Sequence, residues 1–202
     1  MKETVIIILS LIIGILVGFF VDLPINFQDT PITTILLCGI LFSVGLSIGS
    51  DKETLNSIRH LSPSLLMLPF CTVIGSLIGT LVITLFIPQL TLSTGLAIGS
   101  GLGYYSVSSL IIGDYFGPTL AAVGLFANVF RELLALTTMR FQAKIWGILP
   151  GISSGGANTS DVLLPAITSA SSDEYAVPAI YNGVVTTIIV PFLVTFFCEI
   201  KI

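Results

Sequence analysis

The sequence predicts an all-α integral membrane protein with about five full transmembrane helices and two interrupted, re-entrant hairpin segments in an inverted repeat. Of its 202 residues, 54% are hydrophobic and only 9% are charged, and the mean hydropathy is +1.06, far from the average of soluble domains. Five apolar runs are long enough, or nearly so, to cross a bilayer, which takes about 20 residues. Two further apolar segments are interrupted by glycines and small polar residues.

The five full runs include the first stretch of the chain. This stretch follows Lys2 and lacks a small-residue cleavage site, so we interpret it as a retained helix and not as a signal peptide. The three cysteines lie inside apolar segments without short spacing, and we expect them to be small buried hydrophobes. The runs are Thr4–Val21, Pro31–Gly49, Leu61–Ile87, Pro118–Thr138 and Tyr175–Cys198, and the cysteines are Cys38, Cys71 and Cys198.

The interrupted segments are Leu90–Ile112, which contains GSGLGYYSVSS, and Ile145–Thr168, which contains GISSGGANTSDVLLP. Irregular backbone at membrane depth is tolerated only where protein buries it or where it lines a wet cavity. Interrupted segments in corresponding positions are the best sequence indication of a transporter's binding site. An alternative for the glycines of the first segment is close helix packing through small residues. The glycines that we expect to open the backbone are Gly99, Gly101, Gly103, Gly155 and Gly156.

Basic residues indicate the orientation, because cytoplasmic loops carry an excess of them. The first interrupted segment must then enter and leave from the outer face, and the N-terminus is cytoplasmic. The second is either a matching hairpin from the cytoplasmic side, which we favour, or a broken crossing that puts the C-terminus inside. The hairpin gives two units of opposite orientation whose polar tips lie near the midplane. The basic residues are Lys2, Lys52, Arg59, Arg140 and Lys144.

Charged residues lie well inside the run Pro118–Thr138, at Arg131 and Glu132. A charge at the centre of a spanning helix costs about 2.5–3.5 kcal/mol, so it usually faces the protein interior or an aqueous path. Asn128 lies one turn before Glu132 and shares its face. We expect Asn128, Arg131 and Glu132 to bind substrate or an ion. Alternatively, Arg131 is a structural cation that pairs with a carboxylate or caps carbonyls. Glu132 could likewise be only a structural partner of Arg131 or Arg140.

Asp161 is the one carboxylate of the second interrupted segment. With the hydroxyl of Ser160, the amide of Asn158 and freed backbone carbonyls, it could bind a cation, Na⁺ being the candidate metal, or shuttle a proton. Alternatively, Asp161 only caps a half-helix beginning near Val162, a role also open to Asn158, Thr159 and Ser160.

Hydroxyl groups accompany the first interrupted segment at Tyr104, Tyr105 and Ser106. We expect them to contribute to the same binding site. Asn182, in the last apolar run, is expected to face that cavity, and an interhelical hydrogen bond is the alternative.

Other classes of function lack support in the sequence. No basic patch indicates nucleic-acid binding. Gly151-Ile152-Ser153-Ser154-Gly155 matches G-x-S-x-G, but that motif needs a strand-turn-helix context and a base, and the only histidine, His60, belongs to a short basic loop far away in the chain. We expect no enzyme and no cofactor apart from a coupling H⁺ or Na⁺.

Several motifs in order resemble the LysO family of bacterial lysine exporters. They are GSGLGYYSVSSLI followed by Gly117-Pro118, Asn128 with Arg131-Glu132-Leu133, GGANTSDVLLPAI, and Gly183 with Val190-Pro191-Phe192. The resemblance runs through essentially the whole chain, which we treat as a single transmembrane transporter domain, residues 1–202. It implies an inner-membrane secondary transporter that expels L-lysine and its toxic analogues. An intramembrane acidic pair is central in that family, and Glu132 and Asp161 match it.

Full-length members of this family carry about a hundred further residues before the part matched here. The resemblance therefore implies a separately encoded small membrane subunit as partner, with self-assembly into a homodimer as the alternative. Cation antiport, by H⁺ or Na⁺, of lysine or a related cationic amino acid is the expected mechanism. A passive amino-acid or ion channel, and a non-transporting membrane subunit of a larger complex, are the competing functions.

Overall fold

The computed structural model describes residues 61–200, together with a few isolated positions between Val17 and Ser50. The predicted helices over 4–21 and 31–49 and the predicted cytoplasmic N-terminus therefore lie outside the described residues, apart from those positions. All of the helices described belong to the second of two compact units, Leu41–Ile202. Residues 61–200 form helices and no strands, as predicted.

Three helical stretches are long and apolar enough to cross a membrane: Pro63–Thr84, Pro118–Trp146 and Asp173–Glu199. The first consists of α4 (Pro63–Leu66) and α5 (Leu68–Thr84), and each begins with a proline in its first turn, where a missing N–H is tolerated. The last consists of the 3₁₀ turn η2 (Asp173–Tyr175) and α11 (Ala176–Glu199). These stretches confirm three of the predicted runs.

The middle helix, α8 (Pro118–Trp146), is longer than the apolar run that predicts it. It continues past Thr138 because the residues that follow, among them Arg140 and Lys144, are good helix formers although they are not apolar. Two glycines with positive φ bound it, Gly117 at 86° and Gly147 at 84°. At its two ends the chain therefore turns sharply into the neighbouring short helices.

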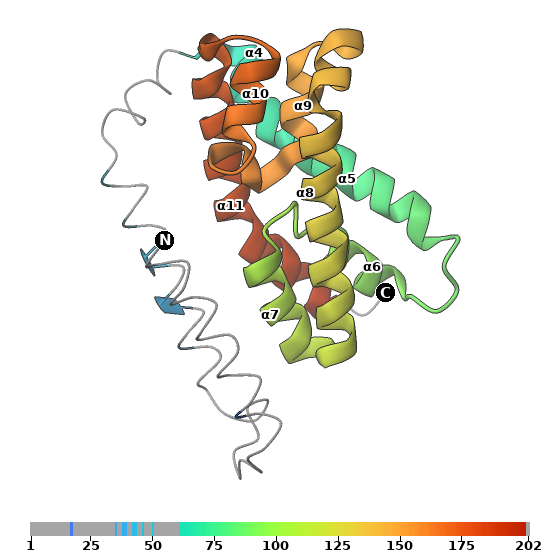
Figure 1. Cartoon of the computed structure of the whole chain (residues 1–202). Helices are drawn as coiled ribbons and strands as arrows, with labels where there is room; N and C mark the ends of the chain where they lie inside the picture. Colours follow the sequence, from blue (N-terminus) through green and yellow to red (C-terminus); the bar gives the residue numbers. More distant parts are fainter. Residues whose placement is uncertain are drawn as a thin grey trace. The chain divides into compact units, whose positions relative to one another are not determined.

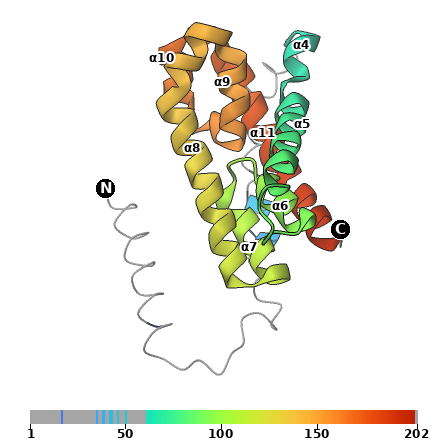
Figure 2. The same ribbon diagram turned by 90° about the vertical axis from the view of Figure 1, so that its right-hand side faces the viewer.

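Both predicted interrupted segments are broken into short helices. The first contains α6 (Leu92–Gly99) and α7 (Tyr105–Phe116). The second contains α9 (Ile148–Gly155), the 3₁₀ turn η1 (Gly156–Ser160) and α10 (Leu164–Ala170). Figure 1 shows α6 and α7 beside the N-terminal half of α8, and α9 and α10 beside its C-terminal half. Figure 2 shows the same arrangement from the side, with α5 across from α8.

Apolar packing fixes the second segment to α8. Met139 of α8 and Ile152 of α9 are fully buried, together with Leu163 and Ile167, and all four belong to one apolar cluster. A methyl group on Gly151 would lie 2.8 Å from the sulfur of Met139, so the helices approach closely where glycine allows it.

The prediction that all three cysteines are buried is wrong for Cys38 and Cys71, which are exposed, and confirmed for Cys198. Ile74 and Ile78 of α5 are exposed as well, and Cys71 lines an open cavity beside Thr72 and Ser76. Lipid is itself an apolar surrounding, so apolar side chains of a spanning helix need no burial within protein.

Candidate functional site

The two interrupted segments meet where their helices end. The backbone N–H of Ala157 donates a 2.9 Å hydrogen bond to the carbonyl of Leu102. A methyl group on Gly156 would overlap that carbonyl, and one on Gly103 would lie 3.2 Å from the carbonyl oxygen of Gly155. Gly103 and Gly156 also have φ values of 93° and 61°, which L-residues rarely adopt. We call this contact, formed by residues 102–103 and 155–157, the tip crossing.

The tip crossing joins a first tip, at residues 102–103, to a second tip, at residues 155–157. Asn128 of α8 binds the first tip. Its Oδ1 accepts a 2.8 Å hydrogen bond from the N–H of Gly103, and its Nδ2 donates to the carbonyls of Ile98 (3.2 Å) and Gly124 (2.9 Å). The side chain is buried. It therefore ties the turn at Gly103 and the last turn of α6 to α8.

Asn182 of α11 holds the second tip in a similar way. Its Nδ2 donates to the carbonyl of Gly156 (3.1 Å) and to the hydroxyl of Thr159 (3.2 Å), and its Oδ1 accepts from the hydroxyl of Thr72 at 3.0 Å. Asn128 follows Gly103 by 25 residues, and Asn182 follows Gly156 by 26. Each tip is thus bound by an asparagine from the long helix that follows it, at nearly the same distance along the chain.

Arg131 binds the C-terminal end of α9. Its Nε donates to the carbonyl of Ser154 (2.9 Å), its Nη2 to that of Ser153 (3.2 Å), and its Nη1 to the hydroxyl of Ser76 in α5 (2.8 Å). These carbonyls lie at the negative end of the helix dipole. Carbonyl capping, one alternative for Arg131, is therefore observed. Within residues 61–200, Arg131 forms no ion pair with a carboxylate, and so it does not pair with Glu132.

Glu132 contacts η1 at Asn158, and Asp161 is the residue directly after η1. The Asn158 Nδ2 donates a 2.6 Å hydrogen bond to Oε2 of Glu132, and the backbone N–H of Asp161 donates a 3.4 Å hydrogen bond to the carbonyl of Asn158. The Asp161 Oδ1 accepts a 2.6 Å hydrogen bond from the N–H of Val162, and the side chain is otherwise exposed. Two neighbouring carboxylates repel each other when both are ionised, so a cation or a shared proton between them is favourable.

The other polar residues of η1 do not cap the following half-helix, so that alternative is wrong for them. α10 begins at Leu164 without a side-chain cap. The Thr159 hydroxyl donates instead to the carbonyls of Gly156 and Ala179, and that of Ser160 donates to the carbonyl of Ala157. The close approach of α11 at Gly183, where a methyl group would lie 2.5 Å from the nitrogen of Ser160, excludes any larger residue.

The glycines of the first interrupted segment have two different roles, close packing of helices and a turn of the backbone. A methyl group on Gly99 would overlap Thr80, and one on Gly101 would lie 2.5 Å from Nδ2 of Asn128, so these glycines serve close packing. Gly103 instead serves the turn, because of its positive φ. The hydroxyl groups at the start of α7 form no hydrogen bond to the two carboxylates in the described part of the chain; they belong to half-buried Tyr104 and Tyr105 and exposed Ser106.

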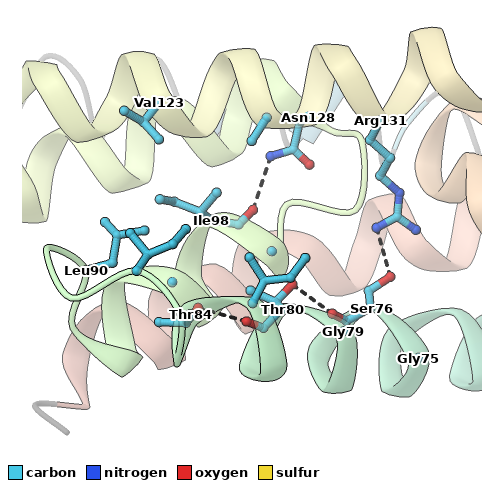
Figure 3. A pocket seen from close by; sticks show the side chains of 15 residues that line it. Gly75, Ser76, Gly79, Thr80, Thr84, Leu90, Ile98, Val123, Asn128 and Arg131 are labelled. Carbon is cyan, nitrogen blue, oxygen red and sulfur yellow. Dashed lines mark hydrogen bonds between the residues drawn. The ribbon is translucent and has the colours of Figure 1, made fainter.

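Three cavities meet at Arg131. The first, about 440 Å³, lies between α5, α6 and α8 and reaches from Leu90 to Arg131; Figure 3 shows Arg131 at one end of it, hydrogen-bonded to Ser76. The second, about 230 Å³, runs from Ser76 to Ser153 and Ser154. The third, about 420 Å³, follows α8 from Arg131 towards Gln142.

Sequence reasoning missed four polar residues of this region: Thr72, Ser76, Ser153 and Ser154. Their position within apolar or glycine-rich stretches was a weak signal, since hydroxyl side chains often bond to their own helix. No group of three metal-ligating His, Cys, Asp or Glu side chains occurs among the described residues, so Na⁺ near Asp161 stays a prediction.

Comparison with known proteins links the chain to exporters. The family model described as "Lysine exporter LysO" matches residues 8–198. "Lysine exporter LysO" of Escherichia coli (strain K12) is 31% identical over 175 residues, which are 84% of this chain and 55% of that protein. The "Putative lysine exporter" of Haemophilus influenzae (strain ATCC 51907 / DSM 11121 / KW20 / Rd) is 29% identical over 193 residues, 96% of this chain and 97% of that protein. No solved structure matches the chain.

Proposed function

Since this chain belongs to the LysO family of lysine exporters, a family of transporters and not of enzymes, we propose that it exports L-lysine across the bacterial inner membrane as a secondary transporter. The chain spans 55% of the length of the Escherichia coli relative. A separately encoded small membrane subunit that completes the transporter is part of the proposal, and a homodimer is its alternative.

The observation that supports the proposal is that Glu132 binds Asn158 of η1 beside the tip crossing, and that Asp161 follows η1 directly. Lysine brings an ε-ammonium group, and two carboxylates of a spanning region offer it charge and hydrogen-bond acceptors. The same carboxylates release the substrate when a coupling H⁺ or Na⁺ replaces it. Such antiport is needed for uphill export, because moving one positive charge against an inside-negative potential costs about 2.3 kcal/mol per 100 mV.

The membrane arrangement of this proposal is an inverted repeat. In it, α6 and α7 form a re-entrant hairpin from the outer face, and α9 and α10 form one from the cytoplasmic face. The matched asparagines support this symmetry, since each binds the tip that precedes it. Arg131 and Glu132 lie near the middle of α8, which favours a tip crossing near the midplane.

Radiolabelled lysine efflux tests the proposal. Cells that lack other lysine exporters receive this chain alone or with its genomic membrane-protein neighbour, as wild type, Glu132→Gln or Asp161→Asn. Glu174→Gln, a matched change in exposed η2, is the control. We expect efflux from wild type and control, and a loss of about tenfold or more in each acid variant, since a hydrogen bond to a charged group contributes about 1.5–3 kcal/mol.

Wild-type protein that is present in the membrane but moves no lysine in either arm would refute the proposal. Full efflux by both acid variants would refute the assignment of the carboxylates. Reconstituted protein given a pH or a Na⁺ gradient identifies the coupling ion, and lysine flux that never responds to either gradient would instead indicate a passive channel.

A further inference from the structure

We propose that Arg131 binds the α-carboxylate of the transported amino acid. The inference rests on the proposed function and adds a second subsite to it. The carboxylates of Glu132 and Asp161 suit the ammonium groups of lysine, but an α-amino acid also carries a negative charge. Leaving that charge unpaired at membrane depth would be costly.

The charge balance around Arg131 leaves room for an anion. Its three hydrogen bonds go to two carbonyls and one hydroxyl, all of them neutral groups. In the described part of the chain, Arg131 forms no ion pair with a carboxylate. The C-terminal end of α9 supplies only about half of a negative charge at best. A bound carboxylate would neutralise the guanidinium, which no carboxylate of residues 61–200 does.

The guanidinium also has donors to spare. It carries five N–H groups, and the described residues accept hydrogen bonds from Nε, Nη1 and Nη2 once each. The remaining hydrogens belong to the two terminal nitrogens, Nη1 and Nη2. A planar fork of this kind matches the geometry of a carboxylate, and the Arg–carboxylate contact is among the stronger hydrogen bonds of proteins.

A substrate can reach this group from more than one direction. Arg131 lines all three cavities of about 440, 230 and 420 Å³. The first two also share Gly75 and Ser76, so the Arg131–Ser76 hydrogen bond lies where they meet (Figure 3). Small-molecule sites typically measure about 300–1,000 Å³. A carboxylate in either of these two cavities would lie beside a residue that lines both, Arg131.

Arg131 and the acids are distinct but adjacent parts of one region. Glu132, the next residue of α8, binds Asn158 of η1. Arg131 binds the end of α9 just before η1, and its Nη2 lies 3.5 Å from where a methyl group of Gly156 would be. Positive and negative groups thus flank the same tip, as the two ends of a lysine molecule require.

Counterflow into vesicles of the reconstituted protein, with its membrane partner where export needs one, tests the subsite on the wild type. Radiolabelled L-lysine competes with unlabelled L-lysine, with L-lysinamide, in which a neutral amide replaces the carboxylate, or with cadaverine, which lacks it. We expect lysine to compete about 10- to 100-fold better, the range of a hydrogen bond to a charged group. Equal competition would overturn the subsite while lysine export stands. No lysine counterflow would overturn the proposed function and the subsite with it.

Variants of Arg131 separate ligand binding from a purely structural role. Arg131→Gln should reduce the preference for lysine over lysinamide towards one, and Arg131→Lys should keep part of it. Arg140→Gln, a matched change at an exposed position of the same helix, should leave the preference unchanged. A variant that transports more slowly but keeps the wild-type preference would assign Arg131 to carbonyl capping alone. If the Arg131→Gln variant does not accumulate in the membrane, the preference for lysine over lysinamide in Arg131→Lys and in the wild type tests the proposal.

Discussion

The side-chain amide of Asn158 donates a 2.6 Å hydrogen bond to the carboxylate of Glu132, and this bond joins the middle of α8 to the second tip. The same amide lies 3.4 Å from where a methyl group of Gly103 would be. Asn158 therefore contacts the carboxylate and approaches both tips. A cation that binds Glu132 must either displace this hydrogen bond or bind the carboxylate in the orientation that the hydrogen bond fixes.

Replacing Asn158 by Ala should lower lysine efflux about tenfold, because the Glu132 carboxylate loses its donor and a hydrogen bond to a charged group contributes about 1.5–3 kcal/mol. A double-mutant cycle of efflux rates checks the cause. If Asn158 acts through Glu132, then Asn158→Ala combined with Glu132→Gln should be no slower than Glu132→Gln alone. Effects that simply multiply would show that the two residues act independently.

Replacing Asn182 by Ala should lower the free energy of unfolding by about 1–3 kcal/mol, because the Gly156 carbonyl and the Thr72 hydroxyl lose a buried partner. Asn128→Ala should have a similar effect, since Gly103 and Ile98 then lose theirs. Thermal unfolding in detergent measures both. Thr137→Ala, which removes an exposed hydroxyl bonded only within α8, should change little; equal shifts in all three variants would contradict the role of the asparagines.

Gly156→Ala should disrupt folding more strongly than Gly147→Ala. Both glycines have positive φ, so each substitution costs about 1–3 kcal/mol of backbone strain. At Gly156 the new methyl group would also overlap the Leu102 carbonyl, whereas no atom of the described residues lies within 4 Å at Gly147. The measurement is the amount of monodisperse protein that each variant yields after extraction from the membrane with detergent. Because both variants carry the backbone strain, the difference between their yields reports the steric overlap at Gly156. Similar yields of the two variants would mean that the tips do not meet as closely as described.

Gly99→Ala should separate α5 from α6, because the added methyl group would overlap Thr80. Overpacking of this kind costs about 1–3 kcal/mol. Gly75→Ala is the control, since no atom of the described residues lies within 4 Å of a methyl group at Gly75 and alanine favours helix. Thermal unfolding should show a loss only for Gly99→Ala. A matching loss at Gly75 would indicate that a further helix covers that face.

Local chemistry explains which parts of this molecule the sequence could predict. The spans near Leu61–Ile87 and Tyr175–Cys198 follow from hydropathy, and the breaks near Gly103 and Gly156 follow from glycines that no regular spanning helix needs. The sequence predicted an end at Thr138, whereas α8 continues to Trp146. The residues after Thr138 are less apolar, but they still favour a helix. The exposure of Cys71 was missed because hydropathy cannot tell a residue that lines an open cavity from one buried in the protein interior.

The partners of the site residues depended on contacts between distant segments. Position inside α8 marked Arg131 and Glu132 as unusual, but nothing local indicated that one binds the end of α9 and the other binds Asn158. The pairing of Leu102 with Ala157 was equally hidden, since backbone groups carry no sequence signal. Tyr104, Tyr105 and Ser106 looked similar to Asn158 and Ser160 by composition, and only the fold separates them from the acids.

A single unbroken helix, α8, touches the first tip through Asn128 and the second through Arg131 and Glu132, all within about one helical turn. A helix is stiff over so short a stretch. A movement of one tip must therefore change the hydrogen bonds that α8 forms with the other tip. Thermodynamic linkage then works in both directions: if a change at the first tip alters the affinity of Glu132 or Arg131 for a ligand, binding of that ligand shifts the equilibrium of the first tip by the same factor.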